Sequence, residues 1–250
     1  GVNGGFVLVS ADDPEMHSSQ NEQDNRYYAK FAKVPMFEPS DSAEAKEMVK
    51  KAYEISEEYD TPVLFRVTTR ISHSKGVVEM GDRKVPEQVQ FEKNPSKYVM
   101  VPANARGRHV AVLERLEKLR EYTETCPWNT VENNGSKVGI ITGGISYQYC
   151  KEVAPDLDYL KLGFSYPLPM KKIEAFIKAH DKVLVIEELE PFYEEQIRAA
   201  GFPVEGKKFT GPRGELSPHR VAKALHEAGV IDETVAAAIP PEENMFPRPP

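Results

Sequence analysis

A polar stretch, MHSSQNEQDN at residues 16–25, follows the first apolar segment of the chain. Its side chains supply hydrogen-bond donors and acceptors, carboxylates and an imidazole. The preceding residues, GGFVLVSADDP, have the pattern of a buried strand and a sharp turn, and ligands of parallel α/β sheets bind beyond the carboxyl ends of strands. The candidates for lining a cofactor site or a subunit interface are His17, Ser18, Ser19, Gln20, Asn21, Glu22, Gln23 and Asp24.

The same stretch also fits an ordinary solvated loop. In that interpretation Ser19 or Asn21 caps the following helix, and Glu22 lies near its positive end. Spacing does not decide between the two interpretations. The sequence assigns a catalytic role to none of these residues and predicts no metal site.

Two further motifs could carry chemistry. The glycines of TGGIS, residues 142–146, follow a predicted strand and precede a helix, so they could cradle a phosphate; a tight turn is the alternative, because the full G-x-G-x-x-G spacing is absent. Glu187 and Glu188 end a strand just before a helix. They could act as acid and base, or as first-turn carboxylates favoured by the helix dipole.

The first 72 residues alternate short apolar runs with amphipathic stretches. Strands are predicted at Phe6–Val9, Val34–Phe37 and Val63–Val67, with helices between them, one opened by a capping box of Asp41 and Glu44. We expect the first strand to be buried on both faces. The β-α-β-α-β order predicts an α/β fold with a parallel sheet.

The rest of the chain divides into three parts. Residues 73–136 are expected to be an extended linker followed by a helix, whose apolar side carries Val110, Leu113, Leu116, Leu119 and Tyr122. Residues 137–235 are expected to form a second α/β unit with strands at KVGIITGG, DYLKLGF and KVLVIEEL. Apolar periodicity predicts a helix after Pro169, and Ser217 and Pro218 are predicted to cap a last helix, HRVAKALHEAG. Residues 236–250 are rich in proline and are expected to be a linker to a further domain.

Composition restricts the class of protein. The net charge of −7 gives no reason to expect nucleic acid or an anionic membrane as a partner, and no apolar run approaches a membrane span. The two cysteines, Cys126 and Cys150, are too few for a four-cysteine iron–sulfur cluster; we expect both to be buried apolar groups, in a cytoplasmic protein.

The segment from ADDPEMHSSQNEQDNRYY to VTTRISHS closely resembles the alpha subunit of the indolepyruvate:ferredoxin oxidoreductases, as do GIITGGISYQY, LKLGFSYPLP and VIEELEPFYEEQI. The resemblance implies that residues 1–72 are the second half of a thiamine pyrimidine-binding-type domain. It also implies that residues 137–235 are a transketolase C-terminal-like domain.

The resemblance further implies an activity that periodicity does not indicate. Such enzymes use thiamine diphosphate with magnesium to decarboxylate arylpyruvates. They pass electrons through 4Fe-4S clusters to ferredoxin and the acyl group to coenzyme A, in an oligomer with a beta subunit. The activating glutamate, the diphosphate-binding domain and the cluster cysteines would all lie outside these residues. We therefore expect the isolated chain to bind none of these cofactors and to be inactive.

Two alternatives remain open. The substrate could be pyruvate or 2-oxoglutarate, because residues outside the chain complete the pocket. The chain could instead be a non-catalytic assembly module that acts only through protein contacts.

Overall fold

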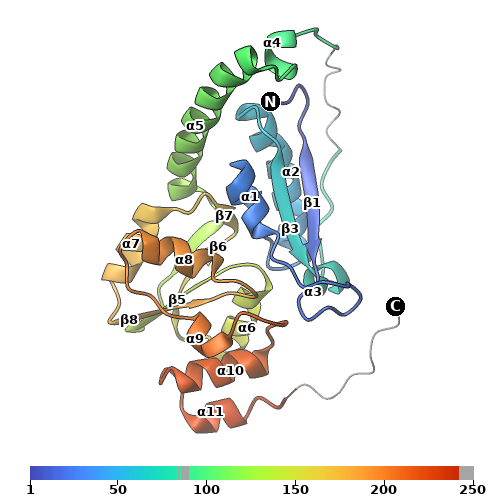
Figure 1. Ribbon diagram of the computed structural model, residues 1–250. Helices are drawn as coiled ribbons and strands as arrows, with labels where there is room; N and C mark the ends of the chain where they lie inside the picture. Colours follow the sequence, from blue (N-terminus) through green and yellow to red (C-terminus); the bar gives the residue numbers. More distant parts are fainter. Residues whose placement is uncertain (84, 86–89, 242–250) are drawn as a thin grey trace.

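The computed structural model describes residues 1–83, 85 and 90–241. Helices and strands alternate over most of this length (Figure 1). The strands are β1 (Val7–Asp12), β2 (Met36–Phe37), β3 (Val63–Thr68), β4 (Asn129–Glu132), β5 (Val138–Thr142), β6 (Asp158–Leu162), β7 (Phe164–Tyr166) and β8 (Lys182–Ile186). The helices are α1 (Arg26–Ala32), α2 (Ser42–Glu58), α3 (Thr69–His73), α4 (Pro95–Tyr98), α5 (Pro102–Thr125), α6 (Ile145–Val153), α7 (Met170–Lys178), α8 (Phe192–Ala199), α9 (Lys207–Thr210), α10 (Pro218–Glu227) and α11 (Glu233–Ala237).

The strands form two sheets of four, which confirms the predicted α/β class. The first has the order β1-β3-β2-β7, and the second has the order β4-β6-β5-β8. Pairing is parallel between β1 and β3, β2 and β3, β5 and β6, and β5 and β8, while β7 and β4 join their sheets antiparallel. The carboxyl ends of β1 and β3 therefore lie at the same edge of the first sheet, and those of β5 and β8 share an edge of the second.

The predicted strand DYLKLGF is in fact two strands in different sheets. β6 lies at the centre of the second sheet, whereas β7 pairs with β2 in the first. Gly163 separates them at a crowded crossing, where a Cβ atom would lie 2.7 Å from Met48 and 2.8 Å from the Trp128 carbonyl oxygen. Because β7 comes from residues 137–235, the two predicted domains share a sheet.

The first strand is longer than predicted and is not buried on both faces. β1 lies at the sheet edge, paired only with β3, and the exposed fractions are 52% for Phe6, 53% for Leu8 and 59% for Val9. The neighbouring strand β3 is the one buried on both faces: Val63, Leu64 and Phe65 are each at most 4% exposed. The row of peptide groups on the outer side of β1 has no partner strand among the described residues.

Two predicted helix starts are confirmed. The Asp41 carboxylate accepts a hydrogen bond from the Glu44 backbone at 2.9 Å, although the Glu44 carboxylate returns to Ser40 rather than to Asp41. Ser217 caps α10 by accepting from the Arg220 backbone at 3.2 Å. These bonds satisfy N–H groups that a helix start leaves without an intrahelical partner.

The predicted apolar side of α5 is only partly correct. Leu116 and Leu119 are buried, but Val110 is 55% and Leu113 44% exposed, because the first half of the helix extends past the body of the molecule (Figure 1). The next segment contains an edge strand, β4, which the sequence pattern did not indicate.

The end of the chain was predicted to be a linker from residue 236. The last helix, α11, continues to Ala237, and residues 242–250 lie outside the described part. Within the described residues, every helix is too short or too polar to cross a bilayer.

The segment between α3 and α4 should be the first place that trypsin cuts. Its described residues are almost all exposed and form no helix or strand, so few contacts oppose local opening. Limited digestion followed by mass spectrometry should give first cuts after Lys75, Arg83 or Lys93. First cuts within α5 or after residue 137 would contradict this expectation.

Candidate functional site

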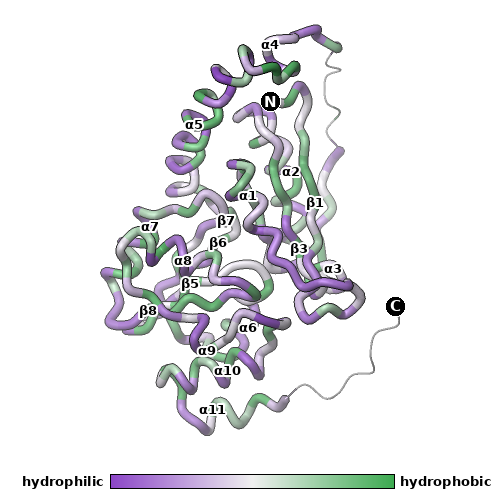
Figure 2. The backbone as a smooth tube through the Cα atoms, in the orientation of Figure 1, coloured by the Kyte–Doolittle hydropathy of each residue, from purple (hydrophilic) through white to green (hydrophobic). Residues whose placement is uncertain are grey.

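The polar loop between β1 and α1 is held in shape by Asp13. One carboxylate oxygen of Asp13 accepts from the backbone N–H groups of Ser18 and Ser19, each at 2.8 Å, and the other accepts from the Thr69 hydroxyl at 2.7 Å. Burial opposes the charge, but these hydrogen bonds outweigh it and hold the pKa of Asp13 below its usual range. The loop is thus a defined turn at the strand ends; Figure 2 shows it as a hydrophilic stretch beside α3.

The loop is also attached to the second half of the chain. The Glu22 carboxylate accepts from the Gly214 backbone at 2.9 Å, and His17 Nε2 lies 3.1 Å from Glu215. Glu215 also receives two bonds from Arg70, at 2.6 Å each. Three segments far apart in sequence therefore meet at the carboxyl ends of β1 and β3.

The eight candidates divide into two groups. His17, Glu22 and Asp24 are partly buried and contact the second half of the chain, whereas Ser18, Ser19, Gln20, Asn21 and Gln23 are exposed. The capping interpretation is wrong for Ser19 and Asn21, because the residue preceding α1 is Asn25, and the first N–H group of the helix, that of Arg26, donates to Asp24. The exposed group provides a polar rim that faces outward.

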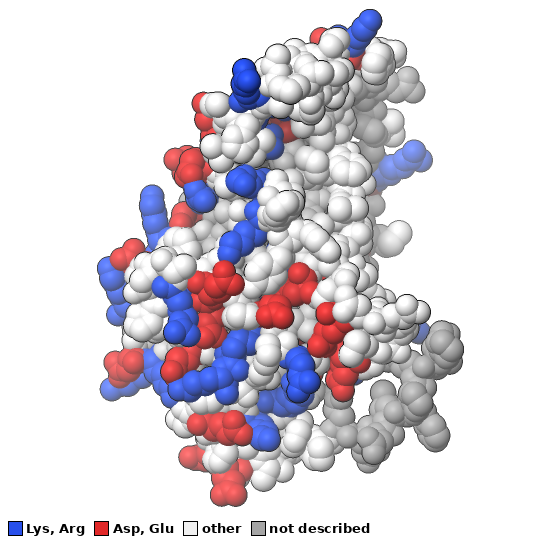
Figure 3. All heavy atoms as spheres, viewed as in Figure 1, with Lys and Arg blue, Asp and Glu red and all other residues white. Residues whose placement is uncertain are grey.

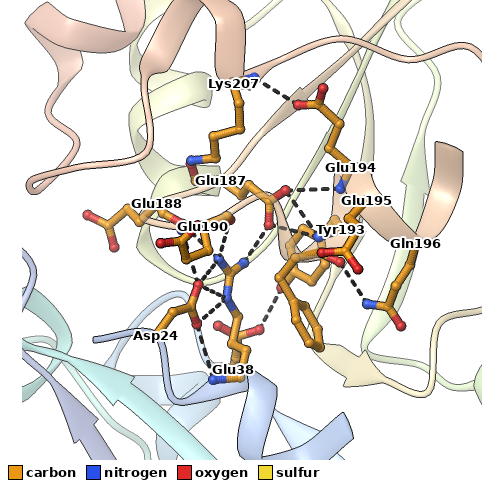
Figure 4. Close-up of polar contacts among 12 residues, drawn as sticks. Asp24, Glu38, Glu187, Glu188, Glu190, Tyr193, Glu194, Glu195, Gln196 and Lys207 are labelled. Carbon is orange, nitrogen blue, oxygen red and sulfur yellow. Dashed lines mark hydrogen bonds and ion pairs between the residues drawn. The ribbon is translucent and has the colours of Figure 1, made fainter. Parts of the chain in front are cut away.

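A buried arginine, Arg26, joins the loop to the second sheet. Figure 4 labels its partners Asp24, Glu187 and Glu190. Its guanidinium is bidentate to Asp24, donates to Glu187 at 2.6 Å, and donates to the carbonyl oxygens of Glu188 and Glu190. Burial opposes the charge of Asp24, but Arg26 outweighs it and lowers the pKa of Asp24 to about 2. The guanidinium carbon also lies 5.1 Å from the ring centre of Tyr193.

A second buried arginine, Arg66, lies in the middle of β3. It donates to Asp12 at 2.6 Å and to Glu38 at 2.5 Å, and Glu38 in turn accepts from the Tyr193 hydroxyl at 2.6 Å. Both ionic clusters therefore include a residue from the second half of the chain. Paired, hydrogen-bonded charges of this kind are costly to break, because the remaining charge stays buried.

The two adjacent glutamates after β8 have different surroundings. Glu187 accepts from the Tyr193 and Glu194 backbone N–H groups, so it binds the amino end of α8 from outside the helix and not, as the helix-dipole alternative expected, from its first turn. The Glu188 side chain accepts from the Leu216 backbone at 2.9 Å, and burial raises the pKa of Glu188 to about 7. Glu188 can therefore hold or release a proton near neutral pH.

A small cavity separates the two sheets beside these groups. Its lining includes Arg66, Thr68, Gly143, Ser146 and Glu188, and its volume is about 10 Å³, which is about the space of one water molecule. Arg66 Nη2 and the Thr68 hydroxyl are buried there without a hydrogen-bond partner. The cavity leaves no room for a phosphate.

The glycine turn serves packing. A Cβ atom on Gly143 would lie 2.6 Å from the Tyr193 hydroxyl and 2.7 Å from the Leu162 carbonyl oxygen, and Gly144 has a φ of 55°. The tight-turn interpretation of TGGIS therefore accounts for both glycines.

One group of side chains has the composition of a metal site. Ligand atoms of Glu15, His17 and Glu215 lie within 4.8 Å of one another. Both Glu215 oxygens, however, accept from Arg70, whose positive charge opposes a cation at the same place. The group is better described as an ionic contact between the loop and the second half of the chain.

The sequence did not single out Arg26, Arg66, Arg70 or Glu215. A signal was present for Arg66, since a charged residue within the apolar run VLFRVT needs a buried counter-ion. The other three have ordinary local settings, and their roles depend on partners more than 140 positions away.

Glu188→Gln should stabilise the protein in a pH-dependent way. The raised pKa of Glu188 makes a stabilising contribution that is complete below the unfolded value of 4.5 and is lost as the pH rises through about 7. The glutamine keeps an acceptor for the Leu216 N–H but carries no charge. We expect a gain in unfolding free energy of about 1–3 kcal/mol at pH 8 and almost none at pH 4.5.

Urea denaturation at the two pH values measures this effect. The matched control is Glu190→Gln, which changes an exposed carboxylate on the same segment and should have little effect at either pH. A Glu188→Gln protein that is less stable at pH 8 than the unsubstituted chain would contradict the expectation.

The arrangement of the two sheets defines the fold class. A solved 2-oxoglutarate:ferredoxin oxidoreductase from Magnetococcus marinus, with 2-oxoglutarate, coenzyme A and succinyl-CoA bound, superposes with a TM-score of 0.60 over 89% of this chain and 48% of that one, at 14% identity. The chain therefore has the fold of the matched part of this 2-oxoacid:ferredoxin oxidoreductase. No protein-family model matches it.

Relatives in sequence identify the family within this fold class. The indolepyruvate oxidoreductase subunit IorA of Thermococcus kodakarensis is 44% identical over 245 residues, covering 90% of this chain, and that of Pyrococcus horikoshii is 41% identical over the whole chain. The chain belongs to the IorA family, which confirms the resemblance seen in its sequence. It spans 38% and 42% of the length of these two subunits.

Proposed function

We propose that the chain is part of an enzyme subunit that oxidatively decarboxylates arylpyruvates of the indolepyruvate type. A 2-oxoacid, coenzyme A and two oxidised ferredoxins would give an acyl-CoA, carbon dioxide, a proton and two reduced ferredoxins. The identity of 44% over 90% of the chain to a subunit named for indolepyruvate carries this proposal.

Thiamine diphosphate with magnesium would supply the carbanion chemistry of decarboxylation. The cavity between the sheets has room for about one water molecule, so the cofactor would not lie in that cavity. The part of this chain that could line the cofactor site is the exposed polar rim at the carboxyl ends of β1 and β3, made of Ser18, Ser19, Gln20, Asn21 and Gln23. A beta subunit and other domains would supply the rest of the site and the clusters, since Cys126 and Cys150 are buried.

The residues of this chain would act by positioning. Asp13 fixes the turn of the loop, and the contacts of Glu22 and Arg26 hold it against the second sheet. A wall built in this way stays in one position while substrate enters, which favours reaction by keeping the reacting groups aligned.

Substrate comparison in the assembled enzyme tests the proposal. The full-length subunit, purified with its partner subunit, should reduce ferredoxin with indolepyruvate and phenylpyruvate. The kcat/KM for both should exceed that for pyruvate or 2-oxoglutarate by at least about 100-fold. Preference for pyruvate or 2-oxoglutarate would overturn the arylpyruvate assignment. Assembly without turnover of any 2-oxoacid would favour the non-catalytic module.

A further inference from the structure

The helix α5 is packed on one side only. It runs for 24 residues, and its buried side chains, Leu116, Leu119 and Thr123, all lie in its second half. Its first half is held near the body through Arg108, which donates to Asp60 at 2.8 Å. The opposite side faces away from both sheets and contacts no other element in Figure 1.

This outer side carries one stripe of exposed residues. Arg106, Val110, Leu113 and Glu117 are spaced by four, three and four positions, so they share a helix face. Val110 and Leu113 are the apolar centre of the stripe, 55% and 44% exposed. We call these four residues the α5 stripe.

Charge is distributed unevenly along the helix. The half from Pro102 to Leu113 contains two arginines and no carboxylate, while the half from Glu114 to Thr125 contains four glutamates and three basic residues. The helix dipole adds to this polarity, because it is positive at the amino end and negative at the carboxyl end. Figure 3 shows basic and acidic side chains along the upper left edge, where α5 lies.

We propose that α5 is a dimerisation helix whose partner is the antiparallel α5 of a second copy of this chain. A two-fold axis that passes between Val110 and Leu113 brings Val110 of each copy against Leu113 of the other. The same register sets Arg106 opposite Glu117 and His109 opposite Glu114. Glu117 also pairs with Arg120 of its own helix, so in the dimer its carboxylate would lie between two guanidinium groups.

A second copy fits this stripe because the basic end of the stripe in one copy matches the acidic end in the other. An isologous contact requires a self-complementary surface, and the stripe is self-complementary only in the antiparallel direction. A parallel copy would place Arg106 near Arg106 and Glu117 near Glu117, which is repulsive. Because the body lies on the inner side of α5, the body of the second copy lies on the far side and does not collide. The inference does not depend on the activity proposed above.

Sedimentation equilibrium on the purified chain tests the proposal. The mass should rise from one chain toward two as the concentration increases to about 1 mM. Arg106→Glu should weaken association by about tenfold or more, since it sets like charges opposite each other twice. Arg106→Glu combined with Glu117→Arg should recover most of the affinity. The matched control, Lys223→Glu on α10, should associate like the unsubstituted chain, because that lysine is exposed on another surface.

Three outcomes would overturn the proposal. The first is a chain that stays monomeric throughout this range. The second is a charge-swapped double variant no better than Arg106→Glu. The third is a dimer that survives Arg106→Glu but is lost in Leu8→Lys, which would place the contact at the exposed edge of β1.

Cysteine cross-linking tests the direction and the register. The natural cysteines are buried, so new ones on α5 are the accessible thiols. An equal mixture of Val110→Cys and Leu113→Cys chains should form disulfide-linked dimers under mild oxidation, and either variant alone should form far fewer. Equal cross-linking of each variant alone would indicate a parallel or unspecific contact and would overturn the antiparallel register.

Discussion

Replacing Arg26 with methionine should lower the free energy of unfolding by about 3–5 kcal/mol, because it leaves Asp24 and Glu187 buried without their counter-ion. The loss should be largest near neutral pH. The depressed pKa of Asp24 contributes stability that is present above its usual value of 3.8 and is lost as the pH falls toward about 2. The deficit of the variant should therefore shrink below about pH 4, as measured by urea denaturation.

A surface arginine provides the control for this substitution. Arg198 is 63% exposed in its side chain and pairs with Glu194 at 3.4 Å, so Arg198→Met should cost less than about 1 kcal/mol. Adding Asp24→Asn and Glu187→Gln to Arg26→Met should recover part of the stability, because the unpaired charges are then absent. A single Arg26 variant as stable as the unsubstituted chain would show that the cluster does not hold the loop to the second sheet.

Replacing Gln20, Glu22 and Gln23 with alanine in the full-length enzyme should lower turnover by about 100-fold, because a displaced wall misaligns the reacting groups. Stability should fall by only about 1–2 kcal/mol, the effect of leaving the Gly214 and Glu15 N–H groups without the Glu22 carboxylate. Ferredoxin reduction per folded molecule and thermal melting measure the two effects separately.

Variants with fewer substitutions separate the residues that would line the site from Glu22, which holds the loop in place. Gln20 and Gln23 are exposed, so the double alanine variant should leave the melting temperature unchanged and still reduce turnover. Glu22→Ala alone should change both quantities. If the triple variant kept full turnover, the stretch would be an ordinary solvated loop.

Local sequence patterns predicted most elements correctly, because they depend on neighbours within one turn or one strand. The period of apolar residues located α2, α7 and α10, and the caps at Asp41 and Ser217 marked two helix starts. The same method failed for DYLKLGF, which was predicted as one continuous strand. Only the strand pairing in the structure shows that the chain leaves one sheet at Gly163 and enters the other.

The sequence by itself determined the α/β class, the approximate places of most strands and the loop that carries the candidate residues. It also determined the family, because identity of residue types over the whole chain needs no coordinates. The tertiary structure alone decided which candidates act together. The partners of Arg26, Arg70 and His17 lie 145–198 positions away, and local periodicity contains no information at that range. The tertiary structure also decided which apolar residues are buried. Those of β1 and of the α5 stripe are exposed because no other described element covers them.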